Sequence, residues 1–209
     1  QTSSGNLTLW GSSAEAAGLS ASSVTLTSSG NGSMSLKGES AGNAPGIYTS
    51  DAFSVSSSSN NDVTVQGLAS ASNGIWVNSG AFSLTNTGNG NMMTAGSSGG
   101  SSASGIYVAA GSLSIVNSGN GTANILGLGG ATSNGIFVGG SNKVDAINNG
   151  ISGAMNIIGN ASQSSGYGIF TGGALNVNSS SAGAVSLQGL SNGGSGVSVT
   201  RSEERRVGK

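Results

Sequence analysis

The stretch GIYVAAGSLSIVNSGNGTANILG, residues 105–127, decides the fold of this chain. Within it, apolar side chains alternate with other side chains in three short runs: Ile106 and Val108, Leu113 and Ile115, Ala123 and Ile125. A period of two is typical of a β-strand, whose successive side chains point to opposite faces, whereas a helix needs apolar residues three and four positions apart. The stretch therefore predicts three strands joined by short corners.

The three runs return along the whole chain. The first run starts with a Gly and an aliphatic residue, and this pair recurs in steps of 28 to 33 residues, at Gly18, Gly46, Gly74, Gly105, Gly135, Gly168 and Gly196. The corner between the second and third runs has a nearly constant length, while the corner from the third run to the next first run varies. A period near 30 residues with variation at one corner indicates a stacked repeat architecture.

Equivalent strands that recur every 30 residues are expected to stack in parallel on the next coil. Parallel crossovers are overwhelmingly right-handed. We therefore predict an all-β fold, a right-handed parallel β-helix (β-solenoid) with three short strands per coil and about seven coils, which forms one segment over residues 1–200. The predicted core contains Leu7, Leu9, Met34, Leu36, Val63, Val65, Ile75, Val77, Phe82, Leu84, Ile106, Val108, Leu113, Ile115, Ile136, Val138, Ile157, Ile169, Leu175, Val177, Val185 and Leu187.

Residues 201–209, RSEERRVGK, differ sharply from the rest of the chain. They carry six charged side chains, against seven in the preceding 200 residues. The string resembles the translation of a sequencing-library adapter, so we interpret it as a non-native tail.

The composition of the body excludes several function classes. It has two Lys against five Asp and Glu, and the chain has no His and no Cys. Nucleic-acid binding needs basic patches, and a membrane span needs about 18 consecutive apolar residues. The sequence shows neither, nor a carboxylate pair for acid–base catalysis, a metal-ligand cluster or a phosphate-binding loop. We expect no enzyme activity, no catalytic or metal-binding residue, no cofactor, no nucleic-acid partner and no insertion into a membrane.

One predicted outer face carries a column of aromatic residues. In the first run of each coil the residue between the two inward side chains must point outward, and on five consecutive coils it is aromatic: Tyr48, Trp76, Tyr107, Phe137 and Phe170. The column could bind sugar rings by stacking, or it could stabilise the parallel sheet. These five residues are the candidate ligand site, and the structural role is the one we expect.

The succession of a GI-aromatic-V run, an S-L-x-I run, a GNG turn and a run that closes in Gly resembles the β-strand repeats of large exported bacterial adhesins. It is similar to two-partner secretion proteins of the filamentous-haemagglutinin type and to autotransporter passenger domains, over about residues 5–200. The resemblance implies a stalk segment of a longer surface-exposed or secreted adhesin that serves cell adhesion. It also implies export through an outer-membrane transporter and, through the parent protein, a glycan or protein of a host surface as partner.

Two other functions remain open at this stage. A polysaccharide-binding or polysaccharide-degrading β-helix protein would share the fold, although a degrading enzyme needs carboxylates and basic residues in one cleft. An ice-binding solenoid would need a flat, regular Thr or Ser face. We also expect end-to-end self-association, because the coils at residues near Leu7 and Val199 leave open strand edges with no cap in the sequence.

Overall fold

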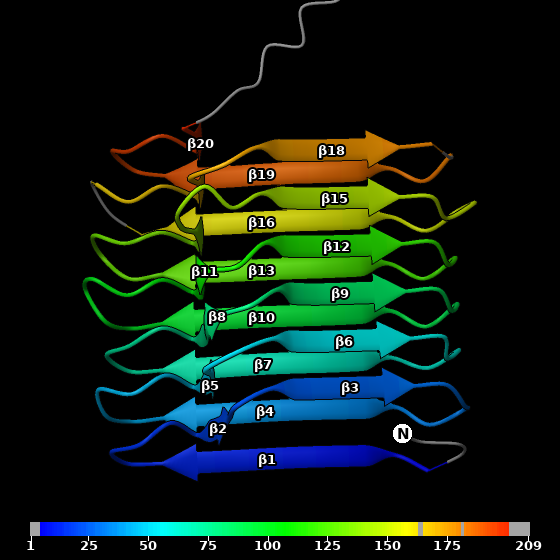
Figure 1. Ribbon diagram of the computed structural model, residues 1–209, viewed down its shortest axis with the longest axis horizontal. Helices are drawn as coiled ribbons and strands as arrows, with labels where there is room; N and C mark the ends of the chain where they lie inside the picture. Colours follow the sequence, from blue (N-terminus) through cyan, green and yellow to red (C-terminus); the bar gives the residue numbers. More distant parts are fainter. Residues whose placement is uncertain (1–4, 163–164, 181, 201–209) are drawn as a thin grey trace, which may run out of the picture.

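The computed structural model describes residues 5–162, 165–180 and 182–200, so the tail predicted to be non-native, residues 201–209, lies outside the described residues. The described residues form 20 strands and no helix. Every strand pairs in parallel with the equivalent strand of the next coil, and the chain winds into a β-solenoid of three sheets with about 30 residues per turn (Figure 1). The predicted architecture is confirmed.

Each of the three predicted runs forms one sheet. The third run forms sheet 1, the first run forms sheet 2 and the second run forms sheet 3. Sheet 1 contains β1 (Leu7–Ser13), β4 (Met34–Ser40), β7 (Val63–Ala69), β10 (Met92–Ser98), β13 (Ala123–Gly129), β16 (Met155–Ala161) and β19 (Val185–Ser191). Sheet 2 contains β2 (Leu19–Ala21), β5 (Ile47–Thr49), β8 (Ile75–Ser79), β11 (Ile106–Ala110), β14 (Ile136–Val138), β17 (Ile169–Thr171) and β20 (Val197–Val199). Sheet 3 contains β3 (Val24–Ser28), β6 (Phe53–Ser57), β9 (Phe82–Asn86), β12 (Leu113–Asn117), β15 (Val144–Asn148) and β18 (Leu175–Ser179). The described chain thus makes six complete coils and the first two strands of a seventh.

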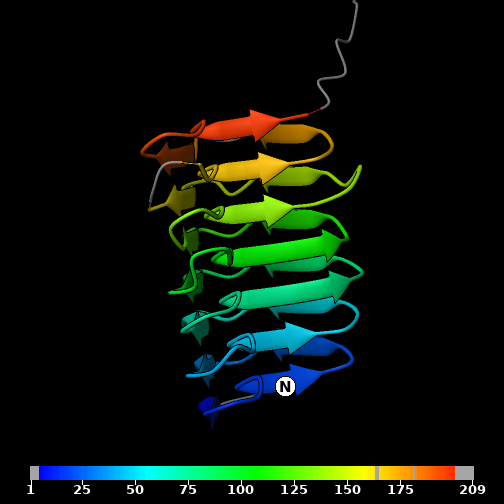
Figure 2. The ribbon, with the colours of Figure 1, turned by 90° about the vertical axis from the view of Figure 1, so that its left-hand side faces the viewer.

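Two of the three corners of each coil, from sheet 1 to sheet 2 and from sheet 3 to sheet 1, differ in shape. The loops from sheet 1 to sheet 2 project from one edge of the stack, at the left of Figure 1, and the compact turns from sheet 3 to sheet 1 lie at the other. Figure 2, turned by 90°, shows the coils stacked on one another along the solenoid axis. Since each coil rests on its neighbours, a longer loop at one corner leaves the register of the strands unchanged.

The core is a column of inward side chains from all three sheets. Phe53, Phe82, Ile106, Ile115 and Ile125 are at most 1% exposed. Their outward neighbours are only partly buried, so most strands alternate as the period of two predicts. Most of the predicted core is confirmed.

The predicted core is wrong at the two ends. Leu9 is 48% exposed and Val177 is 47% exposed, although both occupy inward positions. Leu7, Leu175, Val185 and Leu187 are only partly buried. The reason is that a solenoid core residue is covered by the coils above and below it, and the described residues place a coil on only one side of these positions.

The interior also contains a polar row that the sequence analysis missed. Asn86, Asn117 and Asn148 are fully buried on three consecutive coils of sheet 3. The Nδ2 of Asn86 donates to the Oδ1 of Asn117 at 3.1 Å, and the Nδ2 of Asn117 donates to the Oδ1 of Asn148 at 3.3 Å. Each amide also donates to a carbonyl of its own following turn, at Gly90, Gly121 or Gly153. The row satisfies backbone carbonyls that the turns bury.

Candidate functional site

The structure places the five aromatic residues of the candidate site in one column on the outer face of sheet 2. Each occupies the middle of its Ile-aromatic-Val or Ile-aromatic-Thr run, and consecutive members of the column are paired in register from one coil to the next. Their side chains are partly buried, while the flanking residues, such as Ile106 and Val108, are buried. The five rings therefore form a continuous column along the solenoid axis.

The rings do not all contact one another in the same way. Tyr107, Phe137 and Phe170 stack, with centroids 4.9 Å apart and ring planes within 7° of parallel. Tyr167, from the preceding loop, adds a tilted contact with Phe170 at 5.3 Å. In this half of the column the faces of the rings are used for contacts between rings.

Trp76 is arranged differently from the other rings. Its plane stands at 86° both to that of Tyr48, with centroids 5.5 Å apart, and to that of Tyr107, at 5.7 Å. Both neighbours therefore meet the indole in edge-to-face contacts, and neither lies parallel over one of its faces. The Nε1 of Trp76 is buried and has no hydrogen-bond acceptor among the described residues. Packing between the two tyrosines, and not a hydrogen bond, fixes the orientation of this ring.

An open groove of about 380 Å³ lies beside Trp76 and crosses three coils. It is lined by Asn73, Trp76, Ser102, Ser104, Tyr107, Ser133, Asn134 and Phe137. None of these side chains is charged. The groove thus combines aromatic rings with uncharged hydrogen-bonding groups, which is the composition of many small-molecule sites.

The two asparagines of this groove are held in fixed orientations. The Oδ1 of Asn73 accepts the backbone N–H of Ser104 at 2.7 Å, and the Oδ1 of Asn134 accepts the backbone N–H of Tyr167 at 2.8 Å. Each amide thereby spans to the next coil. The sequence analysis missed these two residues, although the repeated tetrapeptide SNGI at residues 72–75 and 133–136 carried the signal.

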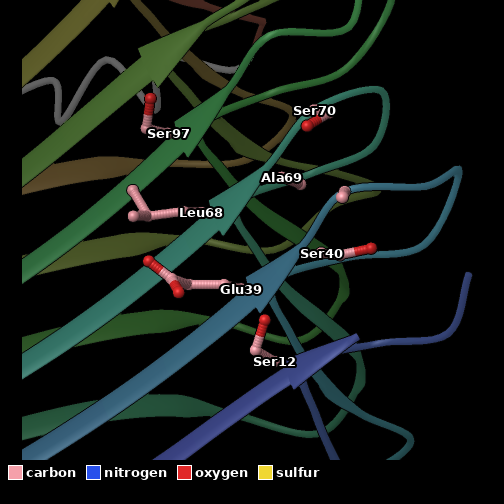
Figure 3. A pocket seen from close by; sticks show the side chains of 8 residues that line it. Ser12, Glu39, Ser40, Leu68, Ala69, Ser70 and Ser97 are labelled. Atoms are coloured by element: carbon pink, nitrogen blue, oxygen red, sulfur yellow. The ribbon is translucent and has the colours of Figure 1, made fainter. Parts of the chain in front are cut away.

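A second hollow, of about 320 Å³, lies on sheet 1 around Glu39 (Figure 3). Ser12, Glu39, Leu68 and Ser97 are register partners on β1, β4, β7 and β10, and their side chains line the hollow with Ser40, Ala69 and Ser70. The carboxylate of Glu39 accepts from the Nζ of Lys37 at 2.7 Å and from the Nε1 of Trp10 at 3.2 Å. The hydrogen bond from Lys37 is the main reason that the pKa of Glu39 lies below its ordinary value. This carboxylate is therefore engaged and ionised, which does not suit a general acid.

Another engaged carboxylate, that of Asp145, lies far along the chain, on sheet 3. Partial burial raises the pKa of Asp145, but hydrogen bonds from Lys143 at 2.8 Å and Asn176 at 2.7 Å together bring it below its ordinary value. Across residues 5–162, 165–180 and 182–200, no three His, Cys, Asp or Glu side chains are grouped so that they could hold a metal ion. The described carboxylates are thus used singly.

A third hollow, of about 140 Å³, is apolar and opens at the first coil. Leu9, Leu19, Val24, Leu26, Leu36 and Ile47 are among the residues that line it. It is the uncovered end of the core.

The part of the chain that the structure describes has no helix long and apolar enough to cross a membrane. No protein-family model, no curated protein and no solved structure matches this chain.

Proposed function

We propose that this chain is a structural stalk segment of a bacterial adhesin that is secreted or exposed on the cell surface. The observation that carries the proposal is the state of the two ends of the solenoid. Leu9 at one end and Val177 at the other occupy inward positions and are about half exposed. One more coil at either end would cover these side chains, so the segment suits a longer solenoid of the same kind.

The outer surface supports the same function. Away from the aromatic column, the outward positions of sheet 3 carry mostly Ser, Thr and Asn, for example Ser54, Ser83 and Ser114 on consecutive coils. Small polar side chains keep such a surface hydrated without creating a docking patch. The carboxylates of Glu39 and Asp145 are each paired with a lysine, so neither is poised as a catalytic acid or base, which favours a spacer over a polysaccharide-cleaving enzyme.

A duplication in the full-length protein tests the proposal. Repeating residues 19–196 in tandem joins Gly196 to Leu19, which reproduces the natural Gly18–Leu19 junction and adds six complete coils. At roughly 4.8 Å per strand spacing, a stalk should lengthen by roughly 30 Å in electron micrographs of the purified protein. Antibodies against the segment should also label intact bacteria that produce the protein. An unchanged length, or labelling only after the cells are broken, would refute the proposal.

A further inference from the structure

We propose that the groove beside Trp76 is a binding site for a linear, uncharged oligosaccharide. The site is distinct from the stalk function and does not depend on it. The rings of the column differ in how their faces are covered. Phe137 is stacked on both sides, by Tyr107 and by Phe170, whereas no ring lies parallel over Trp76. Tyr48 and Trp76 are the two rings of the column with no parallel ring over a face, and of these two Trp76 lines the groove, so the indole is suited to receive the apolar face of a sugar ring.

The groove also presents polar groups in fixed positions. Because the Oδ1 atoms of Asn73 and Asn134 accept backbone N–H groups, the Nδ2 donors of both residues are held in place and make no hydrogen bond with another described residue. Ser102 adds a hydroxyl at the exposed rim of the groove. Preset amide donors and hydroxyls beside an aromatic face match the alternating apolar and hydroxyl-bearing surfaces of a pyranose.

No charged side chain lines the groove, and the body of the chain has only Lys37 and Lys143 as cations, which are paired with Glu39 and Asp145. An acidic glycan would have to give up hydration without a counter-charge in the site. The ligand is therefore an uncharged sugar.

The repeat distance of the coils favours a glycan over a peptide as the ligand. Asn73, Ser104 and Asn134 occupy the same position on three consecutive coils, one residue before the Gly that precedes each sheet 2 strand. Equivalent groups on adjacent coils recur at roughly 4.8 Å, which is close to the length of one pyranose unit in a linear chain. An extended peptide advances roughly 3.3 Å per residue and a polyproline helix roughly 3.1 Å, so neither keeps step with the coils.

The Nε1 of Trp76 is buried and has no acceptor among the described residues. A buried N–H without an acceptor is costly and rare, so packing and not a hydrogen bond must hold the indole in place. Here the indole is held between Tyr48 and Tyr107 in the orientation that leaves its faces free of stacked rings.

Isothermal titration calorimetry of the full chain tests the site, with cellohexaose, chitohexaose, mannohexaose and laminarihexaose as neutral probes. Hexagalacturonate serves as the acidic probe and a decaproline peptide as the peptide probe. We expect at least one neutral hexasaccharide to bind with a Kd at or below the millimolar range. Trp76→Ser should weaken that binding at least tenfold and Asn73→Ala at least threefold. Trp10 is the second tryptophan of the chain; it is 65% exposed and does not line the groove. Trp10→Ser should therefore leave binding of the hexasaccharide unchanged.

Circular dichroism and thermal melting of each variant separate lost binding from lost folding. If Trp76→Ser does not fold, Trp76→Phe and Asn73→Ala provide the same comparison. Absence of binding to all four neutral probes at millimolar concentration would overturn the proposal. Equal binding by folded Trp76→Ser protein, or a preference for hexagalacturonate or decaproline, would overturn it as well.

Discussion

A β-carbon placed on Gly67 would lie 2.2 Å from the carbonyl oxygen of Gly74 and 2.6 Å from the Cγ1 of Ile75. Gly67 belongs to the end of β7 and Gly74 directly precedes β8, so the two glycines close the base of the loop that joins sheet 1 to sheet 2. The same contact occurs between Gly38 and Gly46, and between Gly96 and Gly105. These paired glycines let the chain leave the coil, form a loop of variable length, and re-enter at a fixed point.

Gly67→Ala should therefore destabilise the solenoid strongly. The added methyl group meets backbone atoms that are fixed by the neighbouring coils, and we expect the free energy of unfolding to fall by about 3 kcal/mol. Gly5→Ala is the matched control, since a β-carbon there meets nothing within 4 Å, and should change stability by less than about 0.5 kcal/mol. Urea denaturation of both variants measures the difference, and equal stabilities would contradict the close contact.

Asn117→Asp should be far more damaging than Asn120→Asp. The first replaces a fully buried amide whose Nδ2 donates to Gly121, Asn148 and Ala154, and so places a carboxylate beside three acceptor oxygens. The second alters an exposed amide that donates to Asn89. We expect losses of about 3–5 kcal/mol for the buried change and below about 1 kcal/mol for the exposed one.

The buried change should also make stability depend on pH in a diagnostic direction. Burial raises the pKa of the introduced carboxyl group above its unfolded value, so the destabilisation is present at neutral pH and is relieved as the pH falls through the folded pKa. Denaturation of Asn117→Asp protein at pH 4 and pH 7 tests this, and greater stability at pH 7 would contradict the buried position.

Trp76→Ser should be tolerated and Phe82→Ser should not. Trp76 lies on the outer face and loses two edge-to-face contacts, each worth about 1 kcal/mol, so we expect a cost of about 2 kcal/mol. Phe82 is 0% exposed and packs against Phe53 with ring centroids 5.0 Å apart, and its loss should cost about 4 kcal/mol or more. Thermal melting ranks the two variants, and the reverse order would mean that the faces of the strands are inverted.

The stability of the wild-type chain should be nearly constant from pH 5 to pH 8, because it has no His. The pKa values of Glu39 and Asp145 are both lowered in the folded state, so their contribution is present above the unfolded pKa values and is lost as the pH falls through the folded ones. We expect a modest loss below about pH 4. A marked decline between pH 7 and pH 5 would disagree with this assignment.

The isolated segment should associate end to end in a concentration-dependent manner, because Leu9 and Val177 present uncovered core at opposite ends. Leu9→Lys and Val177→Lys should each shift sedimentation toward the monomer, since a buried unpaired charge opposes stacking of a further coil. Thr8→Lys, an exposed outward position on the same strand as Leu9, is the control and should leave association unchanged. A wild-type chain that stays monomeric at millimolar concentration would show that the ends do not pair.

The sequence alone determined the coil. Alternating runs such as Ile106, Tyr107 and Val108 fix which side chains point inward, and their return about every 30 residues leaves parallel stacking as the arrangement that buries them. The outward position of the aromatic column follows from the same alternation, since a strand has only two faces. The same alternation also predicts inward positions for Asn86, Asn117 and Asn148, because each lies four residues after the first inward residue of its strand.

Only the tertiary structure decided how the residues of one column contact those of the next. Trp76 stands nearly perpendicular to both neighbouring rings while Phe137 stacks on both sides, because ring rotation depends on the packing of three coils at once and cannot be read from a single repeat. Asn73 and Asn134 acquire their role through backbone groups about 30 residues away. The alternation of the sequence places Leu9 and Val177 at inward positions, yet both side chains are about half exposed. An inward side chain of a solenoid is buried by the adjacent coils and not by its own strand.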